Sequence, residues 1–119
     1  MGGPLTVTVR RERGVVIAAV AGEIDISTVA GLQERLFELA DEGRTLIVDL
    51  NRITFIDSAG LGTLVGAARR ATAHDGSLHA VCARPQTRKL LWLTGVDRRI
   101  PMAATVDGAL MFLAKSTGC

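Results

Sequence analysis

Aromatic residues are scarce in this chain of 119 residues, which contains three Phe, one Trp and no Tyr. The core must therefore be built mainly from Leu, Val, Ile and Ala. Basic pairs such as Arg10-Arg11 are scattered, and no aromatic residues interleave them, so the stacking platforms of proteins that bind single-stranded nucleic acid are missing. The chain has 14 basic and 12 acidic residues, so its net charge is only +2. We interpret the basic residues as solvated faces, with no direct contact to nucleic acid.

Cysteine is equally sparse, and long apolar runs are absent. Cys82 lies in an apolar, strand-like run and Cys119 is the last residue, so a disulfide between them is not expected. Two free thiols indicate a reducing cytosol and a cytoplasmic protein. No apolar run approaches the ~20 residues of a membrane helix, and no signal-peptide pattern is present. The start of the chain, MGGPLT, matches a loose acylation pattern that is too short to carry weight.

The common motifs of nucleotide and metal sites are missing as well. There is no GxxxxGK[ST] loop, and Gly60, Gly62 and Gly66 are spaced GxGxxxG inside a predicted helix, unlike the GxGxxG of a dinucleotide-binding turn. His74 and His79 have no Cys or Glu partners at the spacing of a zinc site. We therefore expect no metal and no cofactor, and a small nucleotide-binding module is kept only as an alternative.

What the sequence does contain is the composition of one compact domain. Its hydrophobic content is 48% and its charged content 22%, which excludes general disorder. A chain of this length can bury about two-thirds of the surface of its unfolded form. We expect a flexible N-terminal tail at 1–4, one domain at 5–115 and a C-terminal tail at 116–119.

The spacing of apolar residues predicts an α/β domain with a mixed sheet of four to five strands and about four helices. An N-terminal antiparallel hairpin is followed by parallel βαβ units. The strands are predicted at 5–10, 15–21, 45–50, 78–83 and, as a short edge, 100–103; the helices are predicted at 28–41, 58–73 and 85–93 and after Thr105. Segments 22–27 and 51–57 are expected to be connections, with Ser27 or Thr28 capping the first helix. Trp92, which lies among leucines, is expected in the core; if it is partly exposed, it could instead anchor a partner.

Parallel connectivity brings three polar residues together. The loops after strands 15–21, 45–50 and 78–83 should emerge at the same carboxyl-end edge of the sheet, where ligands of α/β folds usually bind. We therefore expect Asp25, Asp57 and Ser58 to be neighbours. Both histidines map to the opposite end, so a Ser-His-Asp triad that uses Ser58 is not expected, and the protein is predicted not to be an enzyme.

Ser58 has two compatible interpretations. It stands directly before the apolar stripe of a helix, where either Asp57 or Ser58 can be the N-cap that accepts an unpaired backbone N–H. Alternatively, Ser58 is a phosphoacceptor, since a helix N-terminus tolerates negative charge. Phosphorylation would then add about −1.5 to −2 charge to an exposed edge of the sheet.

Three segments carry a family resemblance. The run DLNRITFIDSAGLGTLVGAARR around Ser58 resembles the signature of STAS domains, specifically bacterial anti-sigma factor antagonists. GEIDISTVAGLQERL at 22–36 is similar to the segment that these proteins place before their first helix. TRKLLWLTGVDRRIP at 87–101 is similar to their closing helix and last strand. One departure is Ala59, where some members have a second Ser, so Ser58 is the one hydroxyl of this turn.

The resemblance implies a function that the residues alone do not. It implies that an anti-sigma factor serine kinase phosphorylates Ser58, that a serine phosphatase reverses this, and that Asp25 lies beside the serine. The unphosphorylated protein would bind the anti-sigma factor and release a sigma factor. The partner-binding residues would come from the two loops and the start of the following helix: Asp25, Asp57, Ser58, Ala59, Gly60, Leu61 and Gly62. The protein would be a monomer or weak dimer. The alternative within the family is a STAS subunit of a lipid-transport complex in which Ser58 is never modified.

Overall fold

The computed structural model describes residues 5–117, with side chains described as far as residue 114. In chain order the elements are β1 (Thr6–Glu12), β2 (Val15–Ile24), α1 (Val29–Ala40), β3 (Thr45–Ile56), α2 (Ser58–Ala73), β4 (Ser77–Val81), α3 (Pro85–Leu93), the 3-10 turn η1 (Val96–Arg98), β5 (Met102–Ala103) and α4 (Val106–Thr117). The strand order is β1-β2-β3-β4-β5, antiparallel between β1 and β2 and parallel thereafter. The predicted α/β fold is confirmed. The predicted tail 116–119 overlaps the end of α4, and residues 1–4, 118 and 119 lie outside the described part.

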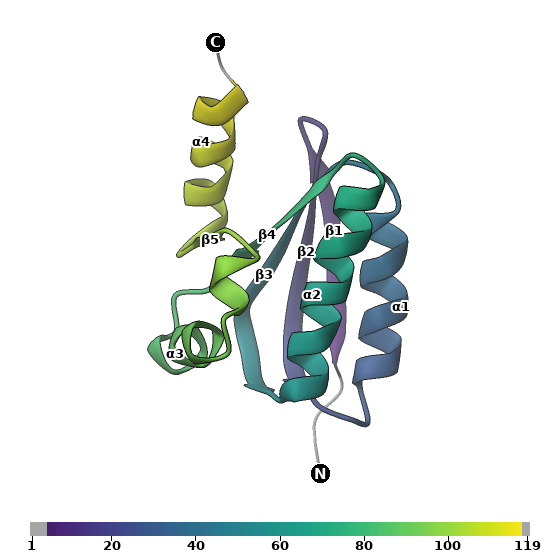
Figure 1. Cartoon of the computed structure of the whole chain (residues 1–119), viewed down its shortest axis with the longest axis vertical. Coiled ribbons are helices and arrows are strands. Elements are labelled where there is room, and N and C mark those ends of the chain that lie inside the picture. Colours follow the sequence, from purple (N-terminus) through teal and green to yellow (C-terminus); the bar gives the residue numbers. More distant parts are fainter. Residues whose placement is uncertain (1–4, 118–119) are drawn as a thin grey trace.

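Helices cover the two faces of the sheet unequally (Figure 1). α1 and α2 lie side by side on one face, above the larger cluster of buried residues, which includes Leu36, Leu46 and Leu64. α4 covers part of the other face, where Ala109 packs with Ile17. The core is aliphatic, as the scarcity of aromatic residues predicts. Within the described residues, no helix has the length and apolar character needed to cross a membrane.

The two central strands are longer than predicted. β2 continues to Ile24 and β3 to Ile56, so the first half of the expected loop 22–27 and all of the expected connection 51–57 except Asp57 belong to the sheet. Beyond residue 21, β2 stays paired with β3 through two register shifts, one between Ala19 and Ala21 and one between Gly22 and Glu23. Such bulges place an extra residue in one strand and change which side chains face the core. The period-two pattern therefore breaks in this region.

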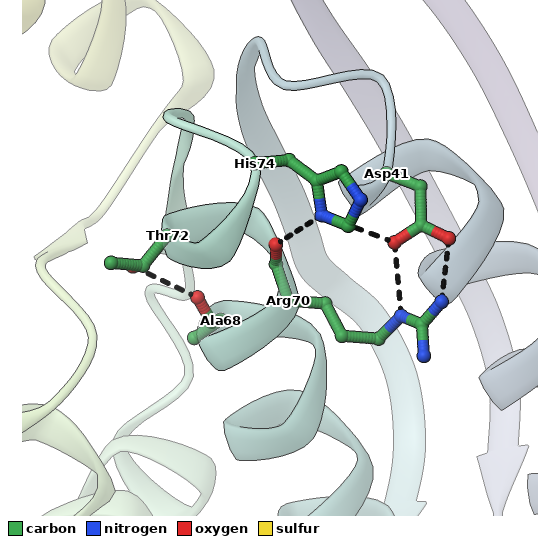
Figure 2. A network of polar contacts seen from close by, with 5 residues as sticks. All are labelled: Asp41, Ala68, Arg70, Thr72 and His74. Atoms are coloured by element: carbon green, nitrogen blue, oxygen red, sulfur yellow. Dashed lines mark hydrogen bonds and ion pairs between the residues drawn. The ribbon is translucent and has the colours of Figure 1, made fainter.

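The far ends of α1 and α2 are joined by a polar network (Figure 2). Asp41, which follows α1, accepts hydrogen bonds from Arg70 Nε at 3.0 Å and Nη2 at 2.6 Å. The Arg70 guanidinium also stacks on the Phe37 ring at 4.8 Å, and its hydrogen bond is the main reason why the pKa of Asp41 is lowered. His74 Nδ1 lies 2.9 Å from the Arg70 carbonyl oxygen. This network fixes the two helices at the end of the domain opposite to the carboxyl ends of β2 and β3.

Trp92 is not a core residue, contrary to the prediction: 60% of its surface is exposed. α3 has only nine residues, and Leu91 is its single fully buried side chain. One residue further along a helix points about 100° away, so Trp92 faces solvent when Leu91 faces the sheet. Leucines on both sides of a residue do not indicate burial in a helix this short.

Candidate functional site

The ends of β2 and β3 bring the predicted site residues together. The last pair of the ladder is Ile24 with Ile56, and the Asp57 N–H then donates to the Ile24 carbonyl oxygen at 3.2 Å. Asp25 and Ser58 each follow one of these joined backbone groups. The predicted proximity of Asp25, Asp57 and Ser58 is therefore confirmed at the level of the backbone.

The third predicted loop does not reach this edge. β4 pairs with β3 only as far as Asp49 and Val81, well before β3 ends. The loop after β4 lies beside the middle of β3, where the Ala83 N–H donates to Asn51 Oδ1 at 2.7 Å. β2 and β3 thus project as a two-stranded extension. The loop after β4 leaves the sheet on the expected carboxyl-end side, because β3 and β4 are parallel, but it stops short of the end of this extension.

Asp57, not Ser58, is the N-cap of α2. Its Oδ1 accepts hydrogen bonds from the N–H of Ala59 at 3.0 Å and of Gly60 at 3.2 Å. Ser58 is the first helical residue and is exposed. Because Asp57 already occupies the capping position, the Ser58 hydroxyl is not needed to begin the helix. The sequence allows either Asp57 or Ser58 as the N-cap, and the hydrogen bonds identify Asp57.

Replacing Asp57 with Ala is expected to lower the free energy of unfolding by about 1 kcal/mol, the typical contribution of a side-chain N-cap. Asp57→Asn keeps an acceptor oxygen in the same place and should remain within about 0.5 kcal/mol of the wild-type protein. Equilibrium unfolding in urea measures both. If Asp57→Ala is as stable as the wild-type protein, the Asp57 side chain does not hold the start of α2.

Asp25 organises the loop between β2 and α1. Its Oδ1 accepts from the Ser27 hydroxyl at 2.6 Å and from the N–H groups of Ser27 at 2.9 Å and Thr28 at 3.2 Å. The N-cap residue Thr28 makes no side-chain capping bond, so the predicted capping by Ser27 or Thr28 is not observed, and Asp25 holds the turn that precedes α1. The Ser27 hydroxyl hydrogen bond is the main reason why the pKa of Asp25 is lowered, and the carboxylate is therefore ionised down to a lower pH than an ordinary Asp.

The first turn of α2 packs closely against the projecting strands. A Cβ added to Gly60 would lie 2.5 Å from Ile24 Cγ2 and 2.8 Å from Ile56 Cγ1, so only glycine permits this approach. Leu61 is buried, with 8% of its surface exposed. Ser58 and Gly62 are exposed, and Ala59 is half-buried. Of the residues predicted to bind a partner, Gly60 and Leu61 therefore face the core, and Ser58 and Gly62 face solvent.

Two residues at this edge were missed by the sequence reasoning. Ile26 is 82% exposed and Phe55 is 49% exposed; the first follows β2 and the second pairs with Glu23 near the end of β3. An isoleucine inside an otherwise polar loop is the signal that could have identified Ile26. Together with Asp25 and Ser58 they form the surface that we call the serine rim. It combines a free hydroxyl, a carboxylate and exposed apolar side chains.

Neither histidine is near the serine rim. His74 is the C-cap of α2 and His79 lies in β4, where Ile47 is its partner on β3. His79 is only 9% exposed, and burial lowers its pKa. A general base for Ser58 is therefore not supplied by a histidine of this domain, as the sequence predicts.

The sheet order and helix arrangement define a small mixed α/β domain with a serine at the start of its second helix. The chain matches the model of the STAS domain over residues 6–109, and it belongs to that family. It is 32% identical over 107 residues to the anti-sigma-F factor antagonist RsfB of Mycobacterium tuberculosis, with 89% of this chain and 87% of the relative covered.

Two further relatives have similar names. The anti-sigma-B factor antagonist of Bacillus subtilis is 29% identical over 106 residues, with 89% of this chain and 97% of the relative covered. A crystal structure of an anti-sigma factor antagonist from Mycobacterium paratuberculosis superimposes with a TM-score of 0.82 at 30% identity, covering 91% of this chain and 92% of that one. The resemblance found in the sequence is confirmed.

Proposed function

We propose that this protein is an anti-sigma factor antagonist, a binding switch controlled by phosphorylation of Ser58, and not an enzyme. One observation carries the proposal: the Ser58 hydroxyl is exposed at the first position of α2 while Asp57 performs the capping. The relatives named anti-sigma factor antagonists match nearly the whole chain, which supports the same role here.

In the unphosphorylated state the serine rim docks onto an anti-sigma factor, which then releases its sigma factor. Ile26 and Phe55 are the exposed apolar side chains that such an interface would bury. Apolar anchors near the centre of an interface usually contribute most of the binding free energy. Ser58 would lie within the contact.

The anti-sigma factor is also the kinase in this proposal. The Ser58 oxygen attacks the γ-phosphorus of ATP, a base of the kinase takes the hydroxyl proton, and ADP leaves. ATP, Mg²⁺ and the base come from the kinase. A serine phosphatase hydrolyses the phosphoserine and restores the binding form.

The site accepts a phosphate locally but not within an interface. The N-terminus of α2 favours an anion, so the phosphorylated domain stays folded. In a docked complex the same dianion, near the ionised Asp25, would lose its hydration. Burying an unpaired charge costs several kcal/mol, so phosphorylation lowers affinity for the partner.

The proposal is tested with the anti-sigma factors of the native host. Affinity capture with immobilised Ser58→Ala is expected to retain a kinase-like anti-sigma factor, which Ser58→Asp does not retain. Incubation of the wild-type protein with that kinase and ATP should add one phosphate, located at Ser58 by mass spectrometry, and none to Ser58→Ala. If both variants capture the same proteins and no phosphate appears, the STAS subunit of a lipid-transport complex becomes the better reading. Heat released on titration with ATP or GTP alone would instead favour a nucleotide-binding module.

A further inference from the structure

α3 presents an apolar surface to solvent. Trp92 is 60% exposed and Leu93 is 63% exposed. Trp92 lines a hollow of about 640 Å³, whose other lining residues include Arg88, Lys89 and Met102. A large aromatic side chain at the edge of a hollow is the kind of anchor that partner proteins bury.

The same segment is the most basic part of the chain. Residues 84–99 contain five basic residues and one acidic residue, in a protein whose net charge is only +2. The basic residues are Arg84, Arg88, Lys89, Arg98 and Arg99. None of them belongs to the ion pairs found among the described residues. Arg84 and Arg88 donate instead to the carbonyl oxygens of Ile53 and Cys82, which leaves their positive charge uncompensated.

This surface lies next to the projecting part of β3 that carries the serine rim. The hydrogen bond from Arg84 to the Ile53 carbonyl ties the start of α3 to the projecting part of β3, two positions before Phe55. In Figure 1, α3 lies beside the lower part of β3, at the same end of the molecule as the start of α2. A partner docked at Ser58 can therefore extend onto α3.

We propose that the outer face of α3 and its hollow bind an acidic segment of a protein partner, with an apolar side chain placed against Trp92. Lys89 and Arg88 supply the complementary charge. Asp97 is the one acid among the lining residues, against the two bases Arg88 and Lys89, so the net charge offered to a partner is positive. Identification of that partner with the anti-sigma factor rests on the proposed function; binding of an acidic segment does not.

A protein segment fits this surface better than nucleic acid does. Proteins that bind single strands place several aromatic side chains along a basic groove, whereas α3 and the segment up to residue 99 contain Trp92 alone. The exposed Leu93 beside Trp92 would also pack better against an apolar side chain of a protein than against a nucleobase. The contact should weaken as salt is added, because exposed charges are screened within about 10 Å at 0.1 M salt.

The single tryptophan provides a direct test. With one Trp and no Tyr in the chain, the indole fluorescence comes from Trp92 alone. Titration with a synthetic peptide of Asp and Glu residues around one Leu should shift this emission to the blue. Lys89→Glu should lower the affinity for the peptide about tenfold, in line with the effect of charge on steered association. Arg44→Glu, the same charge change at an exposed residue near the other end of β3, should leave the affinity unchanged.

The outcomes separate this inference from the proposed function. Ser58→Asp should bind the peptide like the wild-type protein even though it loses the anti-sigma factor. No shift with the peptide, or an equal affinity in Lys89→Glu, would overturn the inference and leave the Ser58 switch untouched. A larger shift with a single-stranded oligonucleotide than with the peptide would also overturn it, in favour of nucleic acid.

Discussion

Ser58→Asp is expected to bind the anti-sigma factor at least about a hundredfold more weakly than the wild-type protein, a change that corresponds to about 2.7 kcal/mol. The new carboxylate lies in the serine rim close to the ionised Asp25, and docking would bury it without a partner. The fold itself should not suffer, because an acidic residue in the first turn of α2 suits the helix dipole. Isothermal titration calorimetry with the purified anti-sigma factor measures the affinity, and circular dichroism confirms that the variant is folded.

Two controls make this result specific to the position. Ser58→Ala removes the phosphoacceptor without adding charge and should stay within about threefold of wild type, since a lone exposed hydroxyl contributes little. Gln33→Glu adds the same single negative charge on the exposed face of α1 and should also bind normally. If Gln33→Glu also binds the anti-sigma factor weakly, the loss of affinity is caused by the net charge of the protein and not by the position of Ser58. Normal binding by Ser58→Asp would mean that the serine is only a helix residue.

Much of this site could be predicted from connectivity alone. Two strands joined through a helix are parallel, and that rule places Asp25 near Ser58 although 33 positions separate them in the sequence. The identity of the cap could not be predicted, because Asp57 and Ser58 are both good N-cap residues. The structure decides it through the hydrogen bonds of Asp57 to Ala59 and Gly60.

The length of the central strands could not be predicted, for a physical reason. A regular strand exposes alternate residues, but in the last part of β3, from residue 50 onward, the buried side chains are Leu50, Ile53 and Ile56. This spacing of three results from the irregular pairing with β2, and on a sequence it does not suggest a strand. The consequence is functional, because the irregular part is what projects beyond β4 and carries Phe55 to the serine rim.

The exposed apolar residues were hidden by the same kind of local ambiguity. Trp92 stands among leucines and Phe55 among isoleucines, and hydrophobic neighbours suggest burial. Which member of such a group faces solvent depends on where the element packs, through Leu91 in α3 and through Ile53 and Ile56 in β3. Exposed aromatic residues are most informative about partners, yet they are the residues for which sequence patterns give the weakest prediction of burial.

Gly60→Ala is expected to destabilise the protein by roughly 1–3 kcal/mol, the usual cost of overpacking a filled core. The added methyl group would stand 2.5 Å from Ile24 Cγ2 and 2.8 Å from Ile56 Cγ1. Both contacts are too short, so α2 must move away from the ends of β2 and β3. The Ser58 position would move with it, and affinity for the anti-sigma factor should fall as well. Urea unfolding measures the first effect and calorimetry the second.

Gly62→Ala is the matched control, two positions along the same helix. A Cβ at Gly62 would meet nothing within 4 Å, so the substitution should stabilise the protein by about 0.4–1 kcal/mol through reduced freedom of the unfolded chain. If Gly62→Ala is more stable yet binds the anti-sigma factor more weakly, Gly62 contacts the partner, because stability and affinity have changed in opposite directions. If Gly60→Ala proves as stable as Gly62→Ala, the close approach of α2 to the projecting strands does not exist, and the serine rim must be held by the Asp57 cap alone.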